Sequence, residues 1–459
     1  MREWEKVTWA TGESEQELIR RVGRAVADYA LRLTRPRDFI LVLAGKGHNG
    51  ADARNTLEHL DERRVDVLDL KDPEADFAEL ETLLALRPAL VIDGLFGVGL
   101  NRPLDAAWIK FIQRLNAARL QVLAVDVPSG LNADTGEPMG AAVKAAVTLS
   151  AGAPKQGLLA QTAWPYVGRL EVATDIGLAP CPLHSELNWT LAGDFAGFPP
   201  ARTVASHKGS FGHLGIIAGS LGYHGAAVLA ARGAQRARPG LITLFPHEAV
   251  YEPVAAQLQA VMVQPWTTGI NIGEYSALLI GPGLAARDLP DELRQYTRRL
   301  WQDSPVPMVV DASALDWLPP RSAPNNAIRV ITPHPGEAVR LLKTAVAQVQ
   351  ANRSQTLREV SQRFGNCWVA LKGHQTLVGR STGDVFVNSS GNPYLAQGGA
   401  GDVLGGYLAG LLAQPALQGD VLKAIRFAVW QHGATADLLQ SSRPNWVVED
   451  LVETLGMCT

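Results

Sequence analysis

The stretch Gly398-Gly399-Ala400-Gly401-Asp402-Val403, followed by the apolar run from Leu404 to Leu412, sets the fold and chemistry expected for the C-terminal part of the chain. Glycines let backbone N–H groups crowd around an anion, and a helix that begins here adds the positive end of its dipole. A phosphate group would therefore bind well. The carboxylate of Asp402 is suited to take a proton from a hydroxyl group that attacks this phosphate. The stretch predicts a phosphoryl-transfer site at a helix start.

Short apolar runs precede this helix and predict the strands of a second α/β domain. They cover residues 214–217, 241–245, 277–280, 308–310, 330–331 and 368–371, with a hairpin over 375–388 and a last helix over 421–439. Ligands bind at the carboxyl ends of such strands, and four of these ends carry unusual residues that we expect to converge with Asp402: Gly281-Pro282-Gly283, Asp311-Ala312, Thr332 to Glu337, and Lys372-Gly373. Each alone is typical of a turn or a helix cap, and only their combination indicates a site.

The first half has the same alternation of apolar runs and amphipathic stretches. Non-alternating runs predict strands buried on both faces over 39–44, 65–70, 89–92, 122–125 and 147–150. Amphipathic stretches over 15–33 and 104–118 lie between them, so we expect a doubly wound, Rossmann-like parallel sheet. Prolines interrupt the pattern near residues 180–200. We predict a first domain over 1–180, a linker over 181–204 and a second domain over 205–459.

Composition and charge exclude several other classes of protein. The 459 residues carry a formal net charge of -3 without a basic cluster, so we expect no nucleic-acid or membrane partner and a small-molecule ligand. No apolar run reaches membrane-spanning length. Three widely spaced cysteines, Cys181, Cys367 and Cys458, fit a reducing compartment. The sequence predicts a cytoplasmic protein.

The second half resembles the ADP-dependent NAD(P)H-hydrate dehydratases of the ribokinase-like superfamily from about Ala205 onward. The resemblance rests on the motifs above together with three more, Ser206-His207-Lys208-Gly209, Gly219-Ser220 and Gly225-Ala226. The resemblance implies a ribokinase-like α/β fold. It also implies that ADP phosphorylates the hydroxyl of the hydrated nicotinamide ring of S-NAD(P)HX, after which phosphate leaves, so that the products are NAD(P)H, AMP and phosphate.

The resemblance also implies a role for each matching residue. Asp402 would be the catalytic base and would also contact the substrate. Ala226, Gly283 and His334 would be further substrate contacts. Mg²⁺ would help to neutralise phosphoryl charge. ADP would contact Lys372, Gly373, His374, Gln375, Thr376 and Gly401. Two residues depart from the expected pattern, namely Ser313 in place of Asp and His224 in place of Thr. A ribokinase-like small-molecule kinase remains the alternative, because such kinases share Gly-Ala-Gly-Asp.

Three strand-end motifs mark the first half. The glycine-rich loop from Gly45 to Asp52 could hold a pyrophosphate, and Arg102 in a second loop, Asp93 to Pro103, could pair with phosphate. The third motif places Asp126 and Ser129 together, either as a site or as caps of a turn.

The order of these motifs resembles the NAD(P)H-hydrate epimerases across about Gly12 to Asp175. The resemblance implies a K⁺ site formed by Asn49, Asp93 and Ser129, and an acid/base role for Asp126 in contact with the substrate. The remaining substrate contacts would be His48, Asn49, Gly50, Ala51, Asp52, Gly97, Val98, Gly99, Leu100, Asn101, Arg102 and Pro103. Relatives of this kind assemble, so we expect a homo-oligomer.

This half departs further from its family than the second half does. His48, Ala51 and Ala53 stand in a loop expected to be Gly-Asn-Asn-Gly-Gly-Asp-Gly, and the helix before Gly12 is short. A β-carbon at 51 or 53 could hinder a close backbone approach. The alternative is a non-catalytic binding or assembly module. The choices between ADP and ATP, and between NADHX and NADPHX, stay open.

Overall fold

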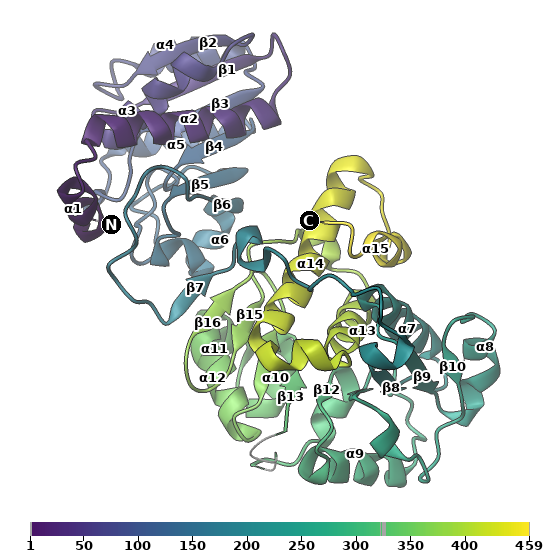
Figure 1. The fold of residues 1–459 in the computed structure, drawn as a ribbon. Coiled ribbons are helices and arrows are strands. Elements are labelled where there is room, and N and C mark those ends of the chain that lie inside the picture. The colour runs from purple at the N-terminus through teal and green to yellow at the C-terminus, as the bar shows by residue number, and fades with distance from the viewer. Residues whose placement is uncertain (1, 322, 324–326, 459) are drawn as a thin grey trace. The chain divides into compact units, whose positions relative to one another are not determined.

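The computed structural model describes residues 2–321, 323 and 327–458, which divide into two compact units (Figure 1). The first unit ends at His184 and the second begins at Ser185. No helix in the described part of the chain is long and apolar enough to cross a membrane.

The first unit is a parallel six-stranded sheet with the order β2-β1-β3-β4-β5-β6, which confirms the predicted doubly wound fold. Its strands are β1 (Phe39–Ala44), β2 (Arg64–Asp69), β3 (Leu90–Gly94), β4 (Val122–Val125), β5 (Val147–Ala151) and β6 (Arg169–Ala173). The edge strand β6 was not predicted, because charged residues alternate with apolar ones along it. Its helices are α1 (Arg2–Ala10), α2 (Glu15–Leu33), α3 (His48–Asn55), α4 (Phe77–Ala85), α5 (Ala106–Ala117) and α6 (Trp164–Val167).

Two apolar cores lie on opposite faces of this sheet. Buried side chains of α2 and α3 pack with alternate residues of β1, β3 and β4 on one face. Buried side chains of α4 and α5 pack with the intervening strand residues on the other. Burial on both faces explains why these strands are continuous apolar runs.

The second unit has a mixed ten-stranded sheet with the order β10-β9-β8-β11-β12-β13-β14-β15-β16-β7. Its strands are β7 (Leu187–Trp189), β8 (His213–Ile217), β9 (Leu241–Phe245), β10 (Met262–Val263), β11 (Ala277–Ile280), β12 (Met308–Val310), β13 (Arg329–Ile331), β14 (Trp368–Leu371), β15 (Leu377–Gly379) and β16 (Val385–Val387). The strands from β10 to β14 pair in parallel, and β15 and β16 form the predicted antiparallel hairpin.

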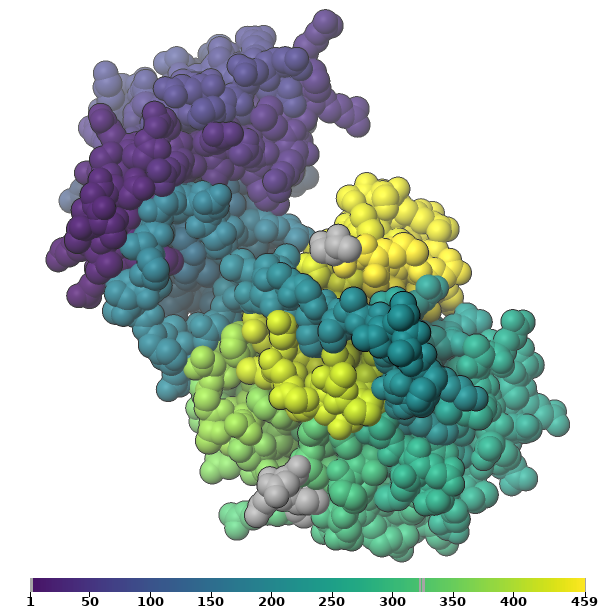
Figure 2. Space-filling view, viewed as in Figure 1, coloured from purple at the N-terminus to yellow at the C-terminus, as the bar shows by residue number. Residues whose placement is uncertain are grey.

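Part of the segment predicted as a linker belongs to the second unit. Strand β7 pairs in parallel with β16 at the sheet edge. Beyond it, the Phe195 ring lies 5.4 Å from that of Phe427 and 5.5 Å from that of Trp430, and Asp194 forms an ion pair with Arg426. In Figure 2 this part of the chain, in teal, lies beside the yellow C-terminal helices. The segment is therefore bound to the second unit by packing and charge.

Nine helices complete the described part of the second unit. They are α7 (His224–Ala237), α8 (Tyr251–Ala255), α9 (Asp291–Asp303), α10 (Pro335–Leu342), α11 (Val346–Ala351), α12 (Arg353–Arg363), α13 (Ala400–Leu412), α14 (Val421–Ser442) and α15 (Val448–Thr454). Helices α7, α13, α14 and α15 share one apolar core with the strands.

Helices α7 and α13 are in backbone contact through glycines. A β-carbon on Gly233 would overlap the carbonyl oxygen of Val403, and one on Gly406 would overlap that of Ala230. Near the other end of the contact, a β-carbon on Gly399 would overlap the side chain of Leu229. Gly399 at the start of α13 lies against Leu229, and Gly410 near its end lies against Ala234 and Ala237, so the two helices are parallel and begin at the same edge of the sheet.

Candidate active sites

The carboxyl ends of the parallel strands in the second unit meet at one edge and are joined by hydrogen bonds. After β8, the Gly219 amide donates to the Pro282 carbonyl oxygen (2.8 Å), and the Ser220 hydroxyl donates to that of Gly283 (2.6 Å). Gly283 has φ +64°, and a β-carbon there would lie 2.9 Å from the Cβ of Ala226. Two residues predicted to contact the substrate are therefore neighbours at the start of α7.

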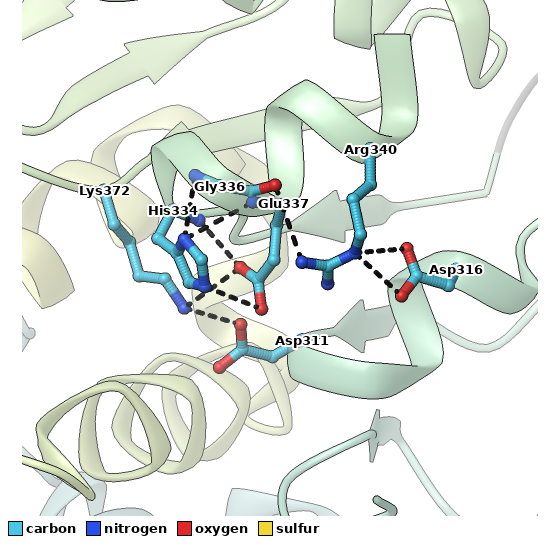
Figure 3. Close-up of polar contacts among 7 residues, drawn as sticks. All are labelled: Asp311, Asp316, His334, Gly336, Glu337, Arg340 and Lys372. Atoms are coloured by element: carbon cyan, nitrogen blue, oxygen red, sulfur yellow. Dashed lines mark hydrogen bonds and ion pairs between the residues drawn. The ribbon is translucent and has the colours of Figure 1, made fainter. Parts of the chain in front are cut away.

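Lys372 is the centre of a buried charged cluster at this edge (Figure 3). Its Nζ lies 2.7 Å from Asp311 Oδ1 and 4.0 Å from Glu337 Oε2. Both carboxylates are almost fully buried. Burial alone would lower the pKa of Lys372, but Asp311 and Glu337 raise it above its usual value, so the ammonium group keeps its charge.

His334 caps helix α10 and is oriented by it. Its Nδ1 accepts hydrogen bonds from the amides of Gly336 (3.0 Å) and Glu337 (3.3 Å), while Glu337 Oε2 accepts one from the His334 amide (2.8 Å). Because Nδ1 is the acceptor, the neutral ring carries its proton on Nε2. The predicted substrate contact His334 is thus fixed in direction and half exposed.

The first turn of α13 lies directly over this cluster. A β-carbon on Gly401 would lie 3.4 Å from Lys372 Nζ, and one on Gly405 would lie 3.4 Å from Asp311 Oδ2. Burial raises the pKa of Asp402 to about 7, the charge of Asp311 adds to this, and Lys372 partly offsets it. The predicted base therefore lies at a helix start with a pKa close to neutrality, which suits proton transfer at physiological pH.

The segment predicted to bind the nucleotide is held by Arg353, a residue that the sequence analysis missed. Arg353 Nη2 donates to the carbonyl oxygens of Leu371 (3.2 Å) and Lys372 (3.4 Å), and Nη1 donates to those of Gln375 (3.3 Å) and His374. Burial lowers the pKa of Arg353 to about 10. One guanidinium group thus fixes the backbone of residues 371–375, and no motif in the sequence marks it.

In the first unit, the residues predicted to bind K⁺ lie together and are buried. The Ser129 amide donates to Asp93 Oδ2 (2.8 Å), and the Phe96 amide donates to Ser129 Oγ (2.8 Å). Asn49 Nδ2 donates to the Phe96 carbonyl oxygen (2.9 Å), which leaves its Oδ1 as an acceptor. Burial raises the pKa of Asp93 to about 6 despite these hydrogen bonds. A cation would stabilise the ionised carboxylate.

Asp126 lies at the same edge, in an ion pair with Lys155 that the sequence analysis also missed. Its φ of +64° is unusual for a residue with a side chain. Burial raises the pKa of the predicted substrate contact Asp52 well above its usual value, and the charge of Asp126 raises it further. Asp52 and Asp126 thus interact across one site.

With the exception of Gly50, the remaining predicted substrate contacts of the first unit are partly or fully exposed. His48 begins α3 and pairs with Glu15 (2.7 Å), and Gly50 is buried in the same helix. Ala51 and Ala53 are also helical, so their β-carbons require no altered turn. The second predicted loop lies after β3 and is partly or fully exposed: Gly97, Val98, Gly99, Leu100, Asn101, Arg102 and Pro103.

One recognised motif lies away from the cluster around Lys372. Residues Lys208–Phe211 form a 3-10 turn just before β8, at the amino ends of the strands. Ser206-His207-Lys208-Gly209 is therefore at the sheet edge opposite Asp402. Within one chain, this motif does not contribute to the site.

Fold and site together define an α/β enzyme with a nucleotide-dependent, ribokinase-like second domain. Residues 214–455 match the family described as NAD(P)H-hydrate dehydratase, and residues 69–157 match the YjeF-related protein N-terminus. The ADP/ATP-dependent NAD(P)H-hydrate dehydratase from Bacillus subtilis, co-crystallised with ATP and Mg²⁺, is 29% identical, with a TM-score of 0.50 over 56% of this chain and 92% of that one. A ribokinase-like protein from Enterococcus faecalis, 23% identical with a TM-score of 0.52 over 60% of this chain and 96% of that one, supports the fold.

Relatives that span both units have the same domain pair. The bifunctional NAD(P)H-hydrate repair enzyme of Gloeobacter violaceus is 34% identical over 91% of this chain and 87% of its own length. That of Coxiella burnetii is 32% identical over 95% of this chain and 93% of its own. The chain belongs to the family of bifunctional NAD(P)H-hydrate repair enzymes. This membership confirms the resemblances of both halves and favours repair over the kinase alternative.

We predict that dehydration by the wild-type protein falls about tenfold per pH unit below pH 7, because Asp402 must be ionised to accept a proton and burial raises its pKa to about 7. Asp402→Asn should lower kcat by about 10²–10⁴-fold with little change in melting temperature. The charge-matched control is Glu449→Gln, an exposed residue of α15. Near-normal turnover by Asp402→Asn would remove the residue from this role.

A second prediction concerns Arg353→Lys, which keeps the charge but lacks the planar fork that reaches four carbonyl oxygens. KM for the nucleotide should rise about tenfold, with a smaller effect on kcat, because the binding segment loses its fixed conformation. Steady-state kinetics over a range of ADP concentrations measure this. Arg363→Lys at the far end of α12 is the control, and equal KM values in both variants would contradict the role of Arg353.

Proposed function

We propose that this protein repairs hydrated NAD(P)H by epimerising NAD(P)HX in the first unit and dehydrating its S form with ADP in the second. The observation that carries the dehydratase part is the position of Asp402 over the Lys372 cluster, at the N-terminus of α13. Asp402 accepts the proton of the ring hydroxyl while the hydroxyl oxygen attacks the terminal phosphorus of ADP, and AMP leaves. Departure of phosphate then restores the ring double bond.

The residues around Asp402 divide binding from chemistry. The amides of Gly399 to Gly401 stabilise the transferring phosphoryl group, with the helix dipole adding to their effect. Lys372 supplies a fixed positive charge beside the phosphates, and the segment from Gly373 to Thr376 contacts the nucleotide. Ala226, Gly283 and His334 position the hydrated ring so that its hydroxyl faces Asp402.

Mg²⁺ is proposed to arrive bound to the nucleotide. In the described ranges, no three His, Cys, Asp or Glu side chains are arranged to hold a metal ion. Mg²⁺ is commonly held by substrate phosphates with only one or two protein carboxylates, so a site without a ready-made group of three ligands is compatible with a metal delivered on ADP. When bound, the ion would neutralise phosphoryl charge.

The overall reaction is testable with an epimeric mixture of hydrated NADH and ADP. The wild-type protein should restore reduced-nicotinamide absorbance for the whole mixture and form one AMP and one phosphate per NADH. Asp126→Asn should restore the S fraction at the normal rate and leave the R fraction to its slow spontaneous epimerisation. A parallel reaction with ATP determines nucleotide preference. A stable phosphorylated product would instead indicate a kinase. Rapid use of both epimers by Asp126→Asn would contradict the role of Asp126 in epimerisation.

K⁺ is proposed as a structural and electrostatic cofactor of the first unit. Asn49 Oδ1, Asp93 and Ser129 Oγ offer oxygen atoms of the kind that hard cations prefer. The buried carboxylate of Asp93 gives the site its negative charge. The ion would hold the loops after β1, β3 and β4 in place around the substrate.

We predict that K⁺ raises the melting temperature of the first unit relative to choline at equal ionic strength, because an ion that binds the folded state stabilises it. Asp93→Asn should abolish this response, whereas the exposed Asp134→Asn should keep it. Calorimetry with increasing K⁺ concentration measures the effect. A K⁺-dependent shift that persists in Asp93→Asn would place the ion elsewhere.

A further inference from the structure

The carboxylate of Asp126 is held through one of its two oxygens. Oδ1 accepts hydrogen bonds from the Ala151 amide (2.9 Å), from the Ser150 hydroxyl (3.5 Å) and from Lys155 Nζ. Among the residues that the structure describes, Oδ2 accepts no hydrogen bond. One oxygen thus anchors the group and the other is available to a ligand.

Lys155 is itself held tightly in place. Its side chain is 10% exposed and that of Asp126 is 13% exposed. Besides Asp126, Nζ donates to the Ala151 carbonyl oxygen (2.9 Å) and to Ser150 Oγ (3.2 Å). Three acceptors satisfy the three N–H groups of a lysine ammonium group, which explains how a charged lysine can be buried here.

The backbone at Asp126 is held in place as well. Its φ of +64° lies in the left-handed region, which Asp tolerates better than most residues with a side chain. Here the Asp126 amide donates to the Leu149 carbonyl oxygen (2.8 Å), and the side chain is anchored through Oδ1. Main chain and side chain are both fixed.

We propose that Lys155 is the positioning residue for Asp126 in epimerisation, holding Oδ1 and the negative charge so that Oδ2 exchanges a proton with the hydroxyl of the hydrated ring. This inference rests on the proposed acid/base role of Asp126. Lys155 acts through the carboxylate and need not touch the substrate.

The proton transfer balances within the site. Oδ2 accepts the O–H proton while the carbon–nitrogen bond of the ring opens, the bond pair moves to nitrogen and the O–H pair forms a carbonyl group. Oδ2 then gives the proton to nitrogen. Closure on the other carbonyl face reverses these steps, so both epimers interconvert without a net change in the enzyme.

Two ionisable groups from other parts of the first unit interact with Asp126 in the described structure, namely Lys155 and Asp52. Lys155 comes from the loop before the 3-10 turn Gln156–Leu159, and Asp52 comes from α3. Burial raises the pKa of Asp52 well above its usual value, the charges of Asp126 and Glu5 raise it further, and that of Lys155 lowers it. Lys155 is the cation that pairs directly with Asp126.

The test uses the full chain without nucleotide, so that only epimerisation proceeds, and follows the conversion of R- to S-NADHX by chromatography from pH 5 to 9. Lys155→Met should lower kcat by about 10- to 100-fold with KM nearly unchanged, because a positioned base contributes about 10²–10⁴-fold. Lys155→Arg keeps a cation that can hold Oδ1 and should restore part of kcat.

The controls separate this inference from the function on which it rests. Lys144→Met removes an exposed lysine of the same unit and should match the wild type. If Asp126→Asn epimerises normally, the acid/base role itself fails. If Asp126→Asn is inactive while a folded Lys155→Met keeps the wild-type kcat and KM, Lys155 is only structural. Should Lys155→Met not fold, a folded Lys155→Arg that loses as much kcat as Asp126→Asn would also overturn the proposal, because a cation that holds Oδ1 is expected to keep part of the rate.

Discussion

Backbone contact between α7 and α13 is the constraint on which the second unit depends. The two helices can approach this closely only because Gly233 and Gly406 lack a β-carbon, so that each lies directly against a carbonyl oxygen of the other helix. Because the helices are parallel, this contact brings both N-termini to the carboxyl edge of the sheet. The amides that would hold a phosphoryl group and the residues that would hold the ring are thereby positioned by the same packing. A looser helix pair would separate Asp402 from Ala226 and Gly283.

Charge balance within the site depends on Lys372. Asp311, Glu337 and Asp402 bring three carboxyl groups close to one buried ammonium group, and this excess of acid raises the pKa of Asp402 and of Glu337 in addition to the effect of burial. A buried carboxylate with a pKa near 7 is a better base than one at its ordinary value. The same cluster keeps Lys372 charged, as its proposed contact with phosphate requires. Burial and crowding thus give Asp402 and Lys372 the properties that their proposed roles as base and phosphate ligand need.

Much of this arrangement could be predicted from the sequence, because strand ends and glycine-rich helix starts carry local signals. Lys372, Glu337 and Asp402 each follow such a signal, and parallel pairing brings them to one edge. Arg353 and Lys155 could not be found in this way, since they act on main-chain carbonyl oxygens or a carboxylate that only the fold brings near. Strands β6 and β7 were missed for a related reason: edge strands are short and half exposed, so they lack a continuous apolar run.

The two units use the same physical device for different chemistry. Each places an aspartate at the carboxyl edge of parallel strands, next to a buried lysine, but the geometry differs. Lys155 bonds directly to Asp126, whereas Lys372 bonds to Asp311 and acts on Asp402 only through space. The direct ion pair fixes one oxygen of the carboxylate, which fits the reversible proton exchange proposed for Asp126. The through-space interaction leaves Asp402 with a raised pKa, which fits its proposed role as the base in phosphoryl transfer.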